Sequence, residues 1–371
     1  TGNATRALSF LMVDFSCALN LSMPLSMLSA IKESSKYDIA VKGGKFLEAA
    51  AIADTIIFDK TGTLTHATPS VVDIVTFGDA DQTESLRIAA FLEGHYPHSV
   101  ANAVVAEARN RNISHEEMHS KVEYVVAHGI ASTINGSNAI IGSYHFVFED
   151  MKCTVPEGEE NKLDSLPTAY SHLYMAIDGV LQAVICIFDP LRDEAADVIK
   201  ELYDLGVSKV CMLTGDNERT AAAVAEKLDL TEYRSGVLPE DKLAFIKAEH
   251  TAGRKVMMIG DGVNDAPALA EADVGIAVNE GAAIAREISD ITISSDDLHR
   301  IVLLRKLSMQ LMNRIDNNYR FIVAFNAALI GLGVSGILTP ASSALFHNGS
   351  TILSGLYSTT SLLDEVEEEI K

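Results

Sequence analysis

Three stretches of the chain are long and apolar enough to cross a membrane as helices. They cover residues 7–31, 322–338 and 339–363, and their carboxylate and imidazole side chains are limited to Asp14 and His347. A hydrocarbon core takes about 20 helical residues to span, and the small residues that let helices approach closely in lipid are dense in the last two stretches. We therefore predict three transmembrane helices. The alternative is that they are buried helices of a soluble domain.

The segment between the first and second apolar stretches has an α/β pattern. From residue 189 onward, short apolar runs alternate with helical periodicity, which predicts strands at 209–213 and 255–259 and helices at 193–205, 218–228, 239–252 and 266–271. Strands that alternate with helices form a parallel, doubly wound sheet. Residues 67–187 instead mix strands (71–77, 137–141) with helices (84–92, 99–109), which predicts an α+β insertion.

Basic residues flank the apolar stretches on one side. They follow the first stretch and precede the second, at Lys32, Lys36, Lys42, Lys45, Arg305, Lys306, Arg314 and Arg320, whereas the turn at Thr339-Pro340 is uncharged. Positive charge collects on the cytoplasmic side of membrane helices. We therefore expect the long intervening segment, and the acidic tail after the third stretch, to be cytoplasmic.

The composition of the chain argues against some classes of function. The formal charge of −22 argues against nucleic acid as a partner, because phosphate backbones require clustered Lys and Arg. The four cysteines lack paired spacing and indicate reduced thiols. A chain of 371 residues is long enough for about two or three units, and its start at Thr1, almost directly before an apolar stretch, leads us to expect a fragment of something larger.

A carboxylate stands at the end of one predicted buried strand. The apolar run 53–58 is followed by Asp59-Lys60-Thr61-Gly62-Thr63-Leu64-Thr65. Open α/β sheets bind their ligands at the carboxyl ends of strands, and a carboxylate there can attack a phosphoryl group to form an acyl phosphate. The alternative is an Asp that only caps the next turn. The seven-residue run resembles the phosphorylation signature of P-type ATPases.

Three further motifs follow strands in the second half of the α/β region. The hydroxyl and backbone N–H groups of Thr214-Gly215-Asp216-Asn217 can hold phosphoryl oxygens, and Lys242 can neutralise phosphoryl charge. Asp261 and Asp265 in the run 260–267, which also contains Asn264, supply hard oxygen ligands of the kind that Mg²⁺ takes together with phosphate and water. The resemblance implies that Asp59, Thr61, Asp261 and Asp265 surround Mg²⁺ and that ATP is the phosphoryl donor.

The residue two positions after the candidate nucleophile, here Thr61, distinguishes two classes of enzyme. Phosphatases of the haloacid-dehalogenase-like superfamily place a second Asp two residues after the nucleophile as general acid and base, whereas this chain has Thr61. Without that acid the phosphorylated carboxylate should persist, as a pump requires.

The resemblance extends to the heavy-metal class of P-type ATPases and covers essentially the whole chain. It implies a transmembrane helix at 1–32, the stalk and first part of a haloacid-dehalogenase-like phosphorylation domain at 33–66, a nucleotide-binding domain at 67–187, the second part of the phosphorylation domain at 188–304, and two helices with an acidic tail at 305–371. The Thr-Gly-Glu loop of an actuator domain is missing from the sequence. We therefore expect a multi-pass protein of a bacterial plasma membrane that phosphorylates itself but does not pump alone.

The insertion carries the family's nucleotide motif with two departures. Glu93 and His98 keep the spacing of its Glu and His, and Gly129 matches the second glycine of its Gly-x-Gly pair, which implies contacts with ATP. Ser99 replaces a proline and Ala127 replaces the first glycine. A structural hydrogen bond of His98 is the alternative reading.

The apolar stretches carry polar groups that imply a transported metal. Cys17 and a proline seven residues later resemble the metal motif of the family's fourth transmembrane helix, and the run from His347 resembles that of the cobalt and zinc subgroup. Polar groups within a membrane are costly and usually face a pathway, so Asp14, Cys17, Asn326 and His347 are candidate ligands, with helix–helix hydrogen bonding as the alternative. One sulfur, one imidazole and several oxygens favour a divalent transition metal (zinc, cobalt, iron or manganese) over copper(I).

Three rival functions stay open at this point. A P-type pump of another ion class would differ in whether Cys17 and His347 bind transition metals. A soluble phosphohydrolase is disfavoured by Thr61, and a non-catalytic sensor by the intact set of phosphoryl-transfer residues.

Overall fold

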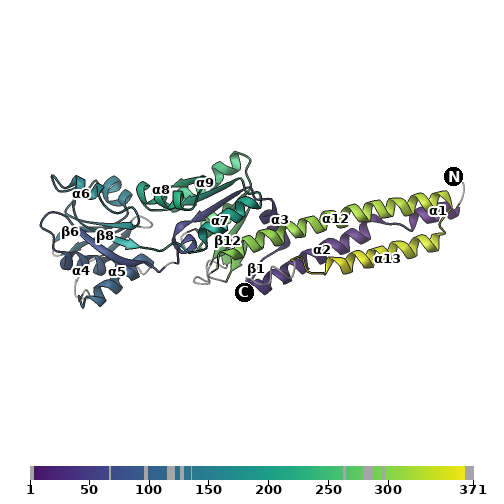
Figure 1. The fold of residues 1–371 in the computed structure, drawn as a ribbon, viewed down its shortest axis with the longest axis horizontal. Coiled ribbons are helices and arrows are strands. Elements are labelled where there is room, and N and C mark those ends of the chain that lie inside the picture. Colours follow the sequence, from purple (N-terminus) through teal and green to yellow (C-terminus); the bar gives the residue numbers. More distant parts are fainter. Residues whose placement is uncertain are drawn as a thin grey trace. The chain divides into compact units, whose positions relative to one another are not determined.

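The computed structural model describes residues 4–66, 68–95, 99–114, 122–125, 129–134, 136–261, 265–278, 287–294 and 297–363. The chain divides into two compact units. One is helical and comprises Thr1–Ala53, Asp290–Ser295 and His299–Lys371; the other is an α/β unit comprising Asp54–Ser289 and Asp296–Leu298. Their elements are labelled in Figure 1.

A parallel sheet forms the centre of the α/β unit. Its strands lie in the order β12-β11-β2-β9-β10, and every neighbouring pair is parallel. They are β2 (Thr55–Asp59), β9 (Lys209–Leu213), β10 (Glu232–Arg234), β11 (Val256–Gly260) and β12 (Val274–Val278). All residues of β2, β9, β11 and β12 are buried, as in a sheet covered on both faces. The connecting helices are α7 (Ala195–Asp204), α8 (Glu218–Lys227), α9 (Pro239–Thr251) and α10 (Ala266–Glu271). The predicted doubly wound sheet is confirmed.

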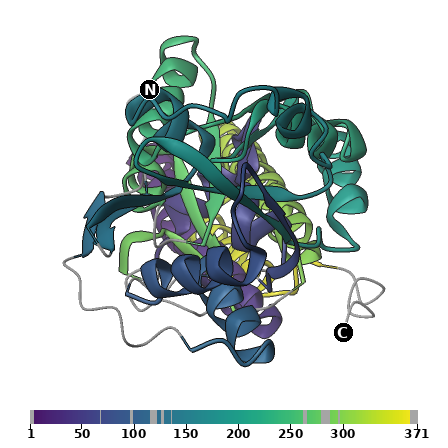
Figure 2. The same cartoon turned by 90° about the vertical axis from the view of Figure 1, so that its left-hand side faces the viewer.

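The insertion is a six-stranded antiparallel sheet. Its order is β3-β8-β7-β6-β5-β4, with β3 (Ser70–Thr76), β4 (Val122–Val125), β5 (Gly129–Ile134), β6 (Ser137–Gly142), β7 (Ser171–Ile177) and β8 (Val180–Phe188). Helices α4 (Gln82–Glu93) and α5 (Ser99–Asn110) pack side by side on one face, shown in blue in Figure 2. A second apolar cluster around Phe77, Phe146 and Tyr174 includes side chains of the helical turn η3 (His145–Asp150). The chain between β6 and β7 also forms the short helix α6 (Glu160–Asp164).

The helical unit is built on three long helices. They are α2 (Phe15–Ser34), α12 (His299–Ser335) and α13 (Pro340–Ser358), which pack against one another, and the unit also contains α1 (Ala4–Leu11), α3 (Gly44–Ile52) and the short turn η1 (Ser35–Tyr37). Two short strands, β1 (Ile39–Val41) and β13 (Ile291–Ile293), pair antiparallel. Among the described helices, length and composition make α12 alone a candidate to cross a membrane. The three predicted spans therefore stay a prediction for α2 and α13.

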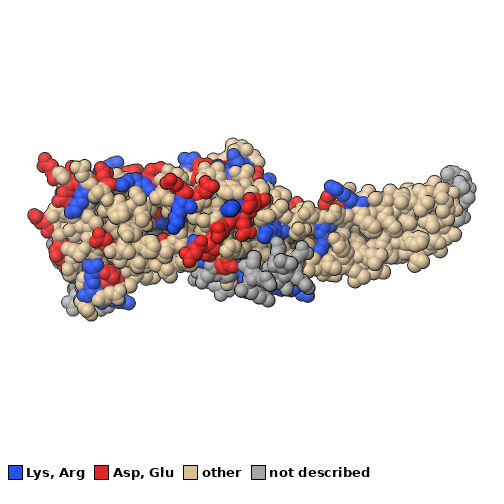
Figure 3. All heavy atoms as spheres, viewed as in Figure 1, with Lys and Arg blue, Asp and Glu red and all other residues tan. Residues whose placement is uncertain are grey.

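The helical unit exposes many large apolar side chains and buries several polar ones. Its exposed side chains include Leu28, Phe321, Ile337, Leu345, Ile352 and Leu353, whereas its buried ones include Ser22, Ser26, Asn318, Asn326, Ser343, His347, Ser350 and Ser354. In Figure 3 the outer part of this unit shows neither acidic nor basic side chains. In a water-soluble helical domain most large apolar side chains are buried, because apolar surface is removed from water on folding.

The first apolar stretch is two helices and not the single predicted one. Helix α1 ends at Leu11 and α2 begins at Phe15. Asp14 has an extended backbone and its side chain accepts a hydrogen bond from the Ser16 backbone N–H at 2.9 Å, so it acts as the N-cap of α2. Pro24 lies inside α2, which continues through it. Because Pro24 has no N–H, the carbonyl of Asn20 loses its helical donor there.

Candidate active site

Asp59 is the last residue of β2, the middle strand of the parallel sheet. The register places Asp59 beside Leu213 of β9 and Phe58 beside Ile259 of β11. The motifs that begin at Thr214 and Gly260 therefore reach the same edge of the sheet as Asp59. The chain turns immediately after Asp59, and Gly62 has φ of +76°, a conformation that favours glycine.

Lys242 joins the two carboxylates at this edge. Its ammonium donates to Asp59 Oδ1 at 2.7 Å and to Asp265 Oδ1 at 2.6 Å. All three residues are at most 8% exposed. Burial alone would lower the pKa of Lys242, but the charges of Asp59 and Asp265 raise it. Burial and the nearby Asp59 charge raise the pKa of Asp265 to about 7, against the opposing effect of Lys242.

Lys60 makes a second ion pair beside the nucleophile. Its ammonium is paired with the Asp216 carboxylate and also donates to Ser171 Oγ at 2.9 Å. Burial alone would raise the pKa of Asp216, but the charge of Lys60 lowers it. The Thr214 hydroxyl accepts from the Asp216 backbone N–H at 3.1 Å, which fixes the turn after β9. Both lysines of the site are therefore held by carboxylates.

The residues present fit a magnesium ion that is held together with a phosphate. Oδ2 of Asp265 is buried and has no hydrogen-bond partner among the described residues. Gly260 makes room for this carboxylate, since a Cβ there would lie 2.3 Å from Asp265 Oδ2. Within the described residues, no group of three or more His, Cys, Asp or Glu side chains forms a metal cage. Mg²⁺ usually takes only one or two carboxylates and completes its shell with water and phosphate, so a magnesium ion does not require such a cage. The predicted ligand set of Asp59, Thr61, Asp261 and Asp265 stays a prediction.

Comparison with known proteins identifies the family. Residues 53–273 match the family described as haloacid dehalogenase-like hydrolase.

The chain belongs to that family.

The relatives that the chain matches include heavy-metal P-type ATPases. The chain is 37% identical over 354 residues to a zinc-exporting P-type ATPase of Mycobacterium marinum (95% of this chain, 48% of the relative). It is 38% identical over 355 residues to a manganese-exporting P-type ATPase of Mycobacterium tuberculosis (95% and 49%). It is 35% identical over 342 residues to the probable copper-exporting P-type ATPase V of that organism (91% and 43%).

Solved structures agree with these relatives. A zinc-transporting PIB-type ATPase in the E2.Pi state superposes with a TM-score of 0.65 at 30% identity, over 92% of this chain and 55% of that one. The catalytic domain of a CPx-ATPase superposes with a TM-score of 0.60 at 29% identity, over 75% and 98%. The resemblance to heavy-metal P-type ATPases is confirmed, and the chain spans about half the length of the curated relatives it matches. P-type ATPases use ATP and Mg²⁺ at their haloacid-dehalogenase-like domain.

The structure describes only part of the family's nucleotide motif. Glu93 is the last residue of α4 and is 2% exposed, and Gly129 begins β5. A Cβ at Gly129 would lie 2.3 Å from the Phe146 ring and 2.5 Å from the Ile141 carbonyl oxygen, so packing alone requires glycine there. His98, Ala127 and Asn264 lie outside the described residues.

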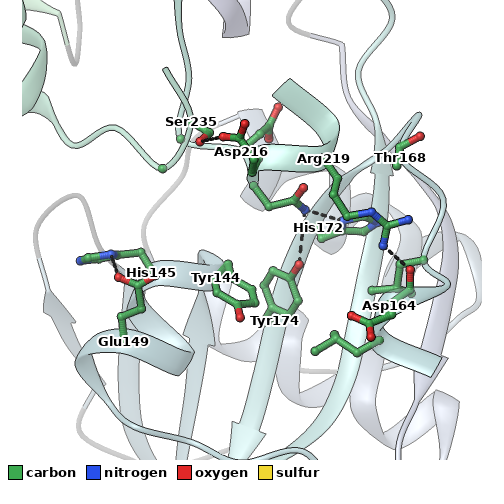
Figure 4. Close-up of a pocket in the computed structure, with 16 residues that line it drawn as sticks. Tyr144, His145, Glu149, Asp164, Thr168, His172, Tyr174, Asp216, Arg219 and Ser235 are labelled. Carbon is green, nitrogen blue, oxygen red and sulfur yellow. Dashed lines mark hydrogen bonds and ion pairs between the residues drawn. The ribbon is translucent and has the colours of Figure 1, made fainter. Parts of the chain in front are cut away.

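A cavity of about 510 Å³ lies between the insertion and the parallel-sheet domain of the α/β unit. Figure 4 shows Tyr144, His172 and Tyr174 of the insertion lining it together with Asp216 and Arg219. Sequence reasoning missed the insertion residues, because nothing in their local pattern separates them from ordinary strand and turn residues.

Asn217 connects the two sides of this cavity. Its Nδ2 donates to His172 Nδ1 at 2.9 Å, while its Oδ1 accepts from the Thr220 backbone N–H as the N-cap of α8. Burial lowers the pKa of His172; Asp216 and the Pro167 carbonyl oppose this effect, and Arg219 adds to it. The neutral imidazole is therefore the form that this contact uses.

The four candidates for the transported metal form one hydrogen-bonded chain in the helical unit. Cys17 Sγ donates to Asp14 Oδ2 at 3.2 Å, and Asn326 Nδ2 donates to the Asp14 carbonyl oxygen at 3.3 Å. Asn326 Oδ1 lies 3.3 Å from His347 Nδ1. Asn326 and His347 are buried, whereas Asp14 and Cys17 are exposed. The structure therefore brings these residues together without assembling a closed metal site.

Proposed function

We propose that this chain is the catalytic and membrane-coupled part of a transition-metal-transporting P-type ATPase, in which Asp59 accepts the γ-phosphoryl group of ATP. The observation that carries this proposal is the buried Asp59–Lys242–Asp265 arrangement at the carboxyl end of β2. Parallel α/β sheets bind ligands at this position.

The proposed reaction uses the side chains and backbone groups at the carboxyl end of β2 and of the strands beside it. Lys242 holds Oδ1 of Asp59, and the other carboxylate oxygen attacks the γ-phosphorus in line while ADP leaves. Lys242 and the backbone N–H groups that follow Thr214 offset the charge of the phosphoryl oxygens. Asp59, Thr61, Asp261 and Asp265 are the residues that would hold Mg²⁺, which would supply positive charge to offset that of the phosphate.

The position of Thr61 makes the product long-lived in this proposal. A phosphatase of the family would activate water with a carboxylate two residues after the nucleophile, whereas this chain has the hydroxyl of Thr61. General base catalysis contributes about 10²–10⁴-fold in rate. The aspartyl phosphate should persist correspondingly longer.

Phosphorylation by labelled ATP tests the nucleophile. With Mg²⁺ and [γ-³²P]ATP, the full chain in detergent should acquire an acid-stable, hydroxylamine-labile label that Asp59→Asn abolishes. Asp193→Asn changes an exposed Asp of the same α/β unit, shortly before α7, and should leave labelling intact. Undiminished labelling of Asp59→Asn would refute the assignment.

We further propose that the helical unit is embedded in a membrane, with the α/β unit in the cytoplasm. The exposed apolar and buried polar side chains of α2, α12 and α13 support this, as do the basic residues at Arg305, Arg314 and Arg320 before the apolar part of α12. Extraction of the expressed chain should require detergent. Recovery in the soluble fraction after alkaline washing would count against membrane insertion.

The proposed cargo is a divalent transition metal held by Cys17, His347 and Asp14. A thiolate, an imidazole and a carboxylate together suit zinc, cobalt, iron(II) or manganese(II) better than copper(I), which favours two or more soft sulfurs. Equilibrium dialysis of the detergent-solubilised chain should show Zn²⁺ or Co²⁺ binding that Cys17→Ala weakens. Cys153→Ala, which alters a buried cysteine of the insertion, should not weaken it. Copper(I) binding that ignores Cys17→Ala would overturn this assignment.

A further inference from the structure

Asn326 sits between two partners in the interior of the helical unit. It is 1% exposed and projects from α12, with its Nδ2 3.3 Å from the Asp14 carbonyl oxygen and its Oδ1 3.3 Å from His347 Nδ1. Both ends of its amide are thus engaged within the protein. One partner precedes α2 and the other lies on α13.

The chemistry of the partners decides the orientation of the amide. A backbone carbonyl oxygen only accepts hydrogen bonds, so the Asn326 nitrogen must face Asp14 and its oxygen must face His347. An amide oxygen also only accepts, and His347 Nδ1 must therefore carry the proton of that contact. In the neutral imidazole, the lone pair is then on Nε2.

We propose that Asn326 is a positioning residue that fixes His347 in its Nδ1–H tautomer and so keeps Nε2 available as a metal-binding nitrogen. This inference rests on the proposed metal transport and changes the role of Asn326 from ligand to orienting partner. A histidine ligand commonly donates its other ring N–H to a protein oxygen, which fixes both tautomer and ring orientation.

Hydroxyl groups of α13 also contact the backbone of His347. The His347 backbone carbonyl accepts from Ser350 Oγ at 2.8 Å and Thr351 Oγ1 at 3.0 Å, within α13. His347 is itself 5% exposed. Because Asp14 also accepts from the Cys17 thiol, the Asn326 amide connects the imidazole to the residue that contacts the candidate thiolate.

The tautomer can be measured directly. The full chain, labelled with ¹⁵N-histidine and held in detergent at a pH where imidazole is neutral, should show His347 with a protonated Nδ1 and an unprotonated Nε2; the signal is assigned by its loss in His347→Ala. Asn326→Leu should convert this signal to a mixture of tautomers and weaken Co²⁺ binding by about 10–100-fold. Asn326→Asp, which retains an acceptor for Nδ1–H, should keep the tautomer.

Asn20→Leu is the matched control, since Asn20 is an exposed asparagine of α2 in the same unit and its replacement should change neither measurement. An Nε2–H tautomer in the unaltered chain, or an unchanged tautomer in Asn326→Leu, overturns the positioning role while the proposed transport function stands. The expected tautomer in a chain that binds no transition metal supports the positioning role and contradicts the transport function instead. The positioning role and the transport function can therefore be refuted independently of each other.

Discussion

Replacing Lys242 with methionine tests whether the two buried carboxylates depend on one cation. The change keeps the apolar stem and removes the ammonium that contacts Asp59 at 2.7 Å and Asp265 at 2.6 Å. These carboxylates are 8% and 1% exposed, so little water contacts them in place of the lost partner. Breaking a buried ion pair from one side costs about 3–5 kcal/mol. We expect a loss of that size in the free energy of unfolding of the α/β unit.

The chain contains no tryptophan whose fluorescence could report unfolding. A thiol-labelling assay therefore suits this measurement. Cys211 is fully buried in β9, next to β2, and should react with a thiol reagent only when the parallel sheet opens. Mass spectrometry of the labelled Cys211 peptide across a urea series then gives the unfolding free energy.

Two further variants make the result decisive. Lys255→Met removes a half-exposed lysine that pairs with Asp273 at 3.0 Å, and should cost less than about 1 kcal/mol. Adding Asp265→Asn to Lys242→Met should recover part of the loss, because one unpaired charge disappears. If Lys242→Met were no more costly than Lys255→Met, the reasoning from buried charge would be wrong.

Three more predictions follow from single contacts. Gly129→Ala should destabilise the insertion by about 1–3 kcal/mol in urea unfolding, because its Cβ meets Phe146 and a backbone oxygen, whereas Gly331→Ala, with open space around it, should be nearly neutral. The pKa of His172 is lowered on folding, so the unfolded chain binds the proton first; the stability difference between the unaltered chain and His172→Leu should shrink as pH falls below about 6.5. Glu33 accepts from two backbone N–H groups after α13, at 2.8 and 3.0 Å, so Glu33→Leu should speed proteolytic cleavage of the chain end.

Local pattern was enough to predict the parallel sheet and the position of its reactive edge. The strand before Asp59 is a short, β-branched run, and the motif after it is contiguous, so both could be read directly from the sequence. The helices α4 and α5 were predicted to within about two residues for the same reason. Only two of the six strands of the insertion were predicted, since half-buried antiparallel strands with bulges lack a clear alternation.

Contacts between distant residues could not be predicted in this way. Lys60 meets Ser171 and Asp216, which are 111 and 156 positions away. The break before α2 was missed because a single Asp14 in an apolar run was interpreted as a pathway residue, whereas its side chain also caps a helix. The exposed apolar surface of the helical unit likewise depends on which side chains point outward, which composition alone does not determine.

The two lysines of the candidate active site both contact carboxylates in this structure, and this bears on the proposed phosphorylation. Lys242 is paired with Asp59 and Asp265, and Lys60, the residue that follows the nucleophile, is paired with Asp216. A phosphate that enters the site must therefore exchange partners with them. Lys60 is also tied to Ser171, a residue of the insertion, so that exchange releases a contact between the insertion and the reactive edge. In the proposed phosphorylation, one ammonium group therefore lies between the entering phosphate and the contact of the insertion with this edge.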